Sequence, residues 1–127
     1  MSNFALEISD LRKVYSGGTE ALKGISLKVK EGDFYALLGP NGAGKSSTIG
    51  IIGTLVTKTS GTVKIFDYDI DKNVSLAKSI LGVVSQEINF SQFEKVIDIV
   101  STQAGYYGIR SSIAKPKVKE MLKRLGL

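Results

Sequence analysis

The stretch Gly39-Pro40-Asn41-Gly42-Ala43-Gly44-Lys45-Ser46 is the most informative part of this 127-residue sequence. It matches G-x-x-x-x-G-K-[ST], the pattern of a loop that holds phosphate groups. Glycines leave room for backbone N–H groups to turn inward around an anion, and a helix that starts near Lys45 points the positive end of its dipole at the same place. We expect Lys45 to reach the β- and γ-phosphates of a nucleotide and the Ser46 hydroxyl to ligate Mg²⁺.

The residues on either side of this loop predict a strand before it and a helix after it. Phe34-Tyr35-Ala36-Leu37-Leu38 is a continuous apolar run, which fits a strand buried on both faces of a parallel sheet. After the loop, apolar residues recur at helical spacing, at Ile49, Ile52, Leu55 and Val56. Gly50 and Gly53 lower the helix propensity there, so we expect packing to stabilise this helix. This context favours a phosphate loop over the alternative, a glycine turn followed by a surface lysine.

The remaining segments predict a mixed α/β fold with an antiparallel portion. Strand-forming residues, alternation or apolar runs predict strands within residues 4–15, 25–29, 62–66 and 81–84. Helices are predicted around residues 75–80, over 95–107 and over 117–125, the last entered through Pro116.

The composition excludes several kinds of chemistry. The sequence is 43% hydrophobic and 23% charged, which is typical of a soluble globular protein, and it has no cysteine and no histidine. Disulfides, histidine metal ligands and Ser/His or Cys/His catalytic pairs are therefore excluded. No secretory signal or membrane-length apolar stretch is visible, so we expect a cytoplasmic location.

The net charge of +5 favours anionic partners such as nucleotides, nucleic acid or acidic lipid. Much of it lies near the end of the sequence, where a solvated helix face and a binding patch are alternative interpretations: Lys115, Lys117, Lys119, Lys123 and Arg124.

Leu37-Leu38-Gly39-Pro40-Asn41-Gly42-Ala43-Gly44-Lys45-Ser46-Ser47 closely resembles the Walker A region of ATP-binding cassette (ABC) ATPases. Residues 22–29 and 59–63 resemble the strands before and after this region in the same family. The resemblance extends from about Leu6 to Leu127 and is strongest to the ATPase subunits of bacterial type-2 export systems. It implies that residues Gly39 to Ser47 bind ATP with Mg²⁺.

Two further positions match the family by spacing. Tyr15 stands where the family places an aromatic residue that stacks on adenine; the alternative is a tyrosine that caps a strand end at the Ser16 turn. Gln86 resembles the glutamine that contacts Mg²⁺ or the attacking water and senses the γ-phosphate. The resemblance therefore implies catalytic roles for Lys45 and Gln86 and metal contacts from Ser46 and Gln86.

The segment 87–93 carries apolar residues in a predicted loop. In the family this region receives a short helix from the membrane-spanning subunit. Ile88, Phe90 and Phe93 are therefore candidates for that docking surface, and packing against the protein's own helices is the alternative.

Three positions depart from the family's pattern. Ser47 replaces the usual threonine, and Ser85 stands where many relatives have proline. Asp67 occupies a turn position where relatives often have glycine, and we expect mild strain because aspartate tolerates a positive φ better than most residues.

The family's other catalytic motifs do not occur in this sequence. Hydrolysis requires the Walker B aspartate with its following glutamate, the signature motif and a switch histidine. Asp67 and Asp98 do not fit a Walker B site, because Lys64 interrupts the strand before Asp67 and Asp98 lies inside a helical pattern. We therefore expect an incomplete P-loop NTPase domain of the ABC type: an antiparallel β subdomain with part of a RecA-like parallel sheet within residues 1–86, and the start of the helical subdomain within 87–127.

The resemblance implies the energy-coupling ATPase subunit of a membrane transporter, peripheral on the cytoplasmic face and paired with membrane subunits. In the complete protein two ATPase subunits would enclose two Mg-ATP molecules. The 127 residues alone are expected to bind but not hydrolyse ATP, and to be marginally stable. Two alternatives are an ABC ATPase acting in translation or DNA repair and a nucleotide-binding remnant without turnover; we expect no nucleic acid partner.

Overall fold

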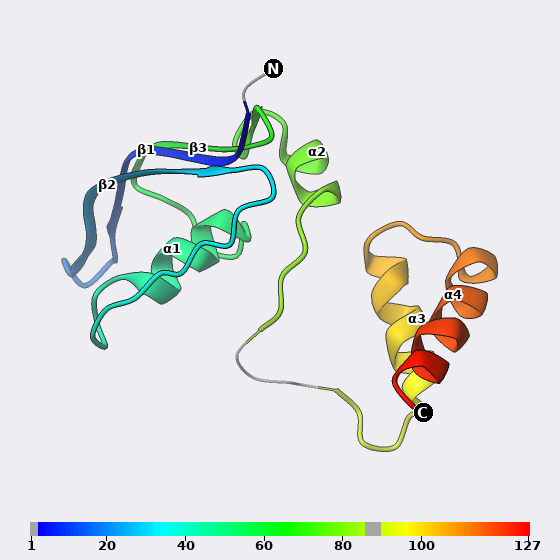
Figure 1. Cartoon of the computed structure of the whole chain (residues 1–127). Coiled ribbons are helices and arrows are strands. Elements are labelled where there is room, and N and C mark those ends of the chain that lie inside the picture. Colours follow the sequence, from blue (N-terminus) through cyan, green and yellow to red (C-terminus); the bar gives the residue numbers. More distant parts are fainter. Residues whose placement is uncertain (1–2, 86–89) are drawn as a thin grey trace. The chain divides into compact units, whose positions relative to one another are not determined.

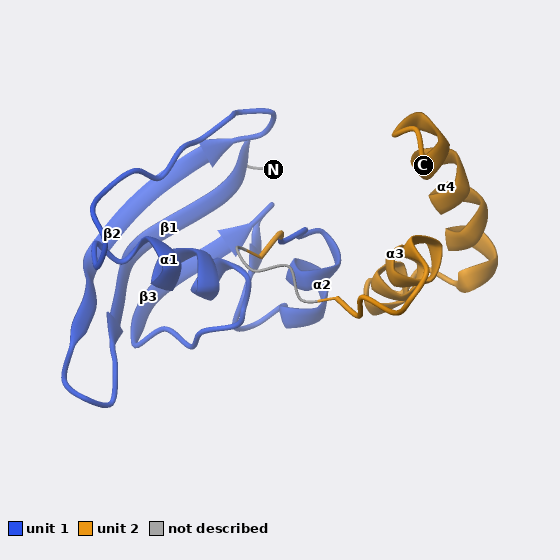
Figure 2. Ribbon diagram, turned by 90° about the horizontal axis from the view of Figure 1, so that it is seen from below, with its two compact units in different colours: residues 1–83 blue, residues 84–127 orange. Residues whose placement is uncertain are grey.

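The computed structural model describes residues 3–85 and 90–127. The chain divides into two compact units, residues 1–83 and 84–127 (Figures 1 and 2). No helix within the described residues is long and apolar enough to cross a membrane.

Unit 1 is built on a four-stranded antiparallel sheet (Figure 1). Its strands are β1 (Phe4–Val14), β2 (Glu20–Lys30), β3 (Ser60–Ile65) and β4 (Tyr68–Asp69), in the spatial order β2-β1-β3-β4. Val63 and Ile65 on β3 are buried while Thr62 and Lys64 are exposed, which is the predicted period of two. The predicted antiparallel portion is thus confirmed.

β1 contains a bulge that brings two core residues to the same face. Ile8 pairs with Leu27 and Leu11 with Ile25, so β1 has one residue more than β2 between these pairs. Asp10 takes a φ of 46° there, and its N–H donates to the Ser26 hydroxyl at 2.9 Å. Because of this extra residue, Ile8 and Leu11 both point into the core, although strict alternation would place them on opposite faces.

A two-residue turn joins β3 to β4. Phe66 and Asp67 both have positive φ values, 44° and 69°. The predicted strain at Asp67 is confirmed, and the preceding aromatic residue shares it. The chain then enters α2 (Val74–Ser79), which agrees with the helix predicted around residues 75–80.

The core of unit 1 lies between the sheet and two short helices. α1 (Lys45–Ile52) lies along one face of the sheet (Figure 1). The buried cluster consists of Ile8, Leu11, Leu22, Ile51, Val63, Ile65, Ile70 and Ala77. α1 ends earlier than predicted, because the chain turns back after Gly53. The N–H groups of Leu55 and Val56 both donate to the Gly50 carbonyl in this turn. Leu55 therefore lies beyond the helix and is 77% exposed.

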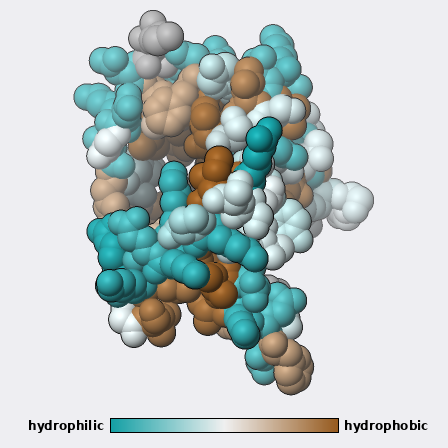
Figure 3. Space-filling view, turned by 90° about the vertical axis from the view of Figure 1, so that its right-hand side faces the viewer, coloured by the Kyte–Doolittle hydropathy of each residue, from teal (hydrophilic) through white to brown (hydrophobic). Residues whose placement is uncertain are grey.

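Two strands predicted for the parallel sheet do not form. Residues 34–38 are irregular, with Phe34 99% and Leu38 89% exposed, and residues 81–84 are irregular with Val84 94% exposed. A strand buried on both faces needs neighbours that pair with its backbone and cover its side chains, and the four-stranded sheet described here supplies none to these segments. Apolar side chains accordingly appear among hydrophilic ones at the molecular surface (Figure 3).

Unit 2 contains α3 (Val96–Tyr106) and α4 (Ser111–Arg124), which contact each other. α3 agrees with the predicted helix. α4 begins earlier than predicted, because Pro116 lies inside it and not at its start. Ala114 and Val118 are its buried residues, whereas its five basic residues from Lys115 to Arg124 are exposed.

Candidate nucleotide-binding site

Gly44 allows the loop before α1 to approach β2 closely. Gly44, the residue before α1, has a φ of 84° in the left-handed region. A Cβ atom at this position would lie 2.6 Å from the Ala21 carbonyl oxygen and would also meet the Leu22 side chain. Only glycine fits here, and the loop is thereby held against β2.

Lys45 folds back over the loop that precedes it. Its Nζ donates hydrogen bonds to the carbonyl oxygens of Gly39 and Pro40, both at 2.6 Å. An ammonium group has three donors, so one remains for a further acceptor. The ammonium is therefore placed inside the bend of the loop, where a phosphate chain would meet it.

The start of α1 carries uncompensated positive potential. Gly44 offers no side chain to cap the helix, and the first turn contains no acidic residue. The first N–H groups of a helix have no partners within the helix, and its dipole places partial positive charge at this end. Together with Lys45, this helix end is suited to bind an anion.

Ser46 is the residue best suited to ligate a metal ion here. It is exposed in the first turn of α1, next to Lys45, and its hydroxyl makes no hydrogen bond to the described parts of the protein. The described residues contain no group of three His, Cys, Asp or Glu side chains that could hold a metal by themselves. This fits Mg²⁺, which commonly takes few protein ligands and completes its shell with phosphate oxygens and water.

Tyr15 is brought to the same end of α1. Its hydroxyl lies 2.9 Å from the Ser47 Oγ, which is half-buried in the first turn of the helix. Lys13 Nζ lies over the Tyr15 ring, 4.8 Å from its centroid. The predicted aromatic residue and the predicted phosphate loop are therefore in direct contact.

Lys13 was not among the predicted site residues. The sequence does indicate that Lys13 lies near Tyr15. Residues two apart in a strand point to the same face, and Lys13 precedes Tyr15 by two positions. The hydrogen bond between Tyr15 and Ser47, two residues far apart in the sequence, had no comparable signal.

Other predicted residues lie outside this site or outside the described residues. Gln86 and Ile88 belong to the segment 86–89, which the structure does not describe. Phe90 and Phe93 are 55% and 100% exposed, so neither is packed within the described helices of unit 2.

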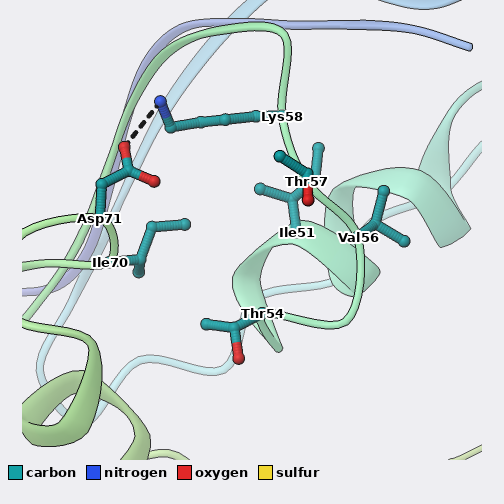
Figure 4. Close-up of a pocket in the computed structure, with 7 residues that line it drawn as sticks. All are labelled: Ile51, Thr54, Val56, Thr57, Lys58, Ile70 and Asp71. Carbon is teal, nitrogen blue, oxygen red and sulfur yellow. Dashed lines mark ion pairs between the residues drawn. The ribbon is translucent and has the colours of Figure 1, made fainter.

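A pocket at the opposite end of α1 is less suited to a nucleotide (Figure 4). One side is lined by Ile51, Thr54 and residues 56–58, and the other by Ile70 and Asp71. Its lysine is already paired, since Lys58 Nζ lies 2.8 Å from an Asp71 carboxylate oxygen. A phosphate chain would meet that carboxylate, so the loop before α1 is the better candidate.

Comparison with known proteins agrees with this geometry. A family model described as ABC transporter matches residues 22–127. The linearmycin resistance ATP-binding protein LnrL of Bacillus subtilis is 37% identical over 96% of this chain and 39% of its own length. The daunorubicin/doxorubicin resistance ATP-binding protein DrrA of Streptomyces peucetius is 32% identical over 97% of this chain and 37% of its own length.

A solved structure extends the likeness to the fold. The ATP-binding cassette MJ0796, seen as a dimer bound to ADP and Pi, has a TM-score of 0.77 and 26% identity, covering 96% of this chain and 57% of that one. The chain belongs to the ABC transporter family. It spans about two fifths of the length of the curated relatives named above. The predicted family, its export-type relatives and the ABC ATPase fold class are confirmed, although the two strands predicted for the parallel sheet do not form.

Proposed function

We propose that this protein binds Mg-ATP at the loop Gly39–Ser47 and uses it to drive a membrane transporter. The observation that carries the proposal is the uncapped start of α1 with the Lys45 ammonium folded over the preceding loop. Both features place positive charge where a triphosphate would lie.

Each residue of the site has a distinct task in this proposal. Lys45 neutralises charge on the β- and γ-phosphates, and Ser46 holds Mg²⁺, which would offset the charge that develops on the phosphate oxygens. The Tyr15 ring stacks on the adenine base. Gln86, by its resemblance to the family's glutamine, would contact the metal ion or the attacking water.

Turnover and transport are proposed for the complete protein. Two ATPase subunits would close around two Mg-ATP molecules, as the dimer of MJ0796 suggests, and reopen after hydrolysis. The Walker B pair, signature motif and switch histidine do not occur in these 127 residues, so hydrolysis needs groups that this sequence does not contain. By this proposal the protein lies on the cytoplasmic face of the membrane, next to its membrane subunits.

Export is the proposed direction of transport. The relatives LnrL and DrrA are named for resistance to linearmycin and to daunorubicin and doxorubicin. These names support an exporter of small toxic compounds over an ABC ATPase that acts in translation or DNA repair.

The proposal is tested by the ATPase activity of the full-length protein with its membrane subunits. Lys45→Ala should abolish ATP hydrolysis and transport, because the charge on the γ-phosphate is no longer offset. Lys72→Ala removes an equal charge from an exposed position outside the loop and should leave both activities unchanged. Full activity in Lys45→Ala would contradict the proposed site.

The exposed Phe90 and Phe93 are the proposed docking point for a membrane subunit. Phe93→Ser should reduce co-purification with that subunit and leave ATP binding intact. Tyr106→Ser, at a position 80% exposed on α3, serves as the matched control. Equal loss of the membrane subunit from both variants would argue against a specific surface at Phe93.

A further inference from the structure

The Tyr15 side chain is held at two separate points. The Lys13 ammonium lies over its ring at 4.8 Å from the centroid, within the range of a cation–π interaction. Its hydroxyl lies 2.9 Å from Ser47 Oγ, which is a hydrogen bond at ordinary length. One contact acts on a face of the ring and the other on its rim.

Both contacts are anchored in other parts of unit 1. Lys13 Nζ also donates a hydrogen bond of 2.6 Å to the Thr57 carbonyl oxygen, in the loop after α1. Ser47 belongs to α1 itself. Lys13 and Ser47 therefore connect Tyr15 to two segments that lie far from it in the sequence.

The backbone of Tyr15 is fixed as well. Its N–H donates to the Thr19 carbonyl at 3.0 Å, and its carbonyl accepts the Gly18 N–H at 2.9 Å. Despite these four contacts, Tyr15 is still 41% exposed. With Lys13 over one face, a flat ligand would have to stack on the other face of the ring.

We propose that Lys13 and Ser47 are positioning residues that fix the Tyr15 ring before the nucleotide arrives. The inference rests on the proposed function, because it assigns them to the base end of the same ATP site. A ring that is already ordered loses less conformational freedom when a base stacks on it, so part of the binding cost is avoided.

Ser47 can serve the phosphate end of the ligand at the same time. A hydroxyl group has one donor and two acceptor positions, so Ser47 can accept a hydrogen bond from Tyr15 and donate its own to a phosphate oxygen. Loss of the tyrosine hydroxyl would remove the link between the base end and the phosphate end of the site.

The test compares ATP with tripolyphosphate, which has the phosphate chain but no base. Binding of each ligand is measured by calorimetry in the full-length protein and in Lys13→Met, which keeps an aliphatic side chain but removes the charge. We expect ATP affinity to fall by about two- to fivefold, the size of an exposed cation–π contact, and tripolyphosphate affinity to stay unchanged. Lys13→Arg should restore ATP affinity, since it keeps a cation that stacks on aromatic rings.

Tyr15→Phe tests the second contact, because it keeps the ring and removes only the hydroxyl. It should lower ATP affinity by about two- to tenfold, the effect expected for one hydrogen bond. Lys23→Met is the matched control for Lys13→Met: it removes an ammonium group from an exposed position on β2 that has no contact with Tyr15 among the described interactions. Melting temperatures of all variants show whether each one folds.

Three results would overturn the inference. Equal losses for ATP and tripolyphosphate in Lys13→Met would show that Lys13 acts only as a general positive charge. Unchanged ATP affinity in both folded variants would show that the ring needs no positioning. If the wild-type protein bound neither ATP nor tripolyphosphate, the proposed function would be contradicted, and the inference with it.

Discussion

At the scale of single residues, Gly44 and Lys45 have different roles at the start of α1. Gly44 lets the loop approach β2 closely, since any side chain there would collide with the Ala21 carbonyl. Lys45 then occupies the bend that this approach creates, bonded to the carbonyls of Gly39 and Pro40. The shape of the proposed binding loop thus depends on a packing contact with the sheet as well as on the loop's own sequence.

Gly61 is expected to be equally intolerant of a side chain, although it lies outside the site. It has a φ of 89°, and a Cβ atom would collide with the Asp10 carbonyl oxygen at the β1 bulge. Gly61→Ala should lower the free energy of unfolding by at least about 1–3 kcal/mol, because it adds backbone strain to the collision.

Chemical denaturation of the full-length protein measures this effect. Gly17→Ala is the control, since Gly17 has no positive φ and no atom within 4 Å of the added Cβ. Equal stability of the two variants would show that the bulge can move away from β3.

The residues of the proposed phosphate loop can be recognised from the sequence more readily than the contacts around them. The residues Gly39 to Ser47 act through local backbone geometry, which a short pattern encodes. The contact of Ser47 with Tyr15 depends instead on how β1 and α1 pack, and no local pattern encodes that packing. Asp67 was predicted because its strain, like the loop, is a property of one turn.

At the scale of elements, α4 shows where a local rule misleads. Pro116 predicts a helix start, because proline lacks the N–H that is unpaired in a first turn. α4 nevertheless begins at Ser111, so Pro116 lies in its interior and cannot donate to the carbonyl of Ser112. Burial of Ala114 on the early turns of α4 offsets part of this loss.

Pro116→Ala should stabilise α4. The substitution restores one backbone donor and removes a ring that clashes with the preceding turn, a gain of up to about 3 kcal/mol in local helix stability. Hydrogen exchange of the α4 amides should slow accordingly, while the amides of β1 exchange at an unchanged rate. Unchanged or faster exchange in α4 would show that Pro116 does not destabilise the helix.

The segments 34–38 and 81–84 show that an apolar run alone does not determine whether a strand forms. Their apolar runs predict buried strands, yet Phe34 and Val84 are almost fully exposed. An apolar run indicates that burial of the segment would be energetically favourable. Burial also requires other segments that cover its side chains and pair with its backbone. That requirement cannot be derived from the run itself.

At the scale of the whole molecule, the exposed apolar residues predict how the 127-residue chain behaves alone. Phe34, Leu38 and Val84 lie open to water in segments with unpaired backbone groups. Such surfaces promote association. The isolated chain should bind the dye ANS and form oligomers at micromolar concentration.

Sedimentation velocity with ANS fluorescence checks this expectation. Phe34→Lys, which places a charge in the exposed run, should reduce both signals; Lys72→Ala should not. A monomeric chain that unfolds cooperatively and binds no ANS would show that these segments are covered in solution.

Calorimetric titration of the full-length protein with ATP in the presence of Mg²⁺ measures whether the loop Gly39–Ser47 binds Mg-ATP. We expect saturable binding that disappears in Lys45→Ala and persists in Lys72→Ala. Binding of equal strength in all three proteins, or no binding by a folded wild-type protein, would contradict this expectation.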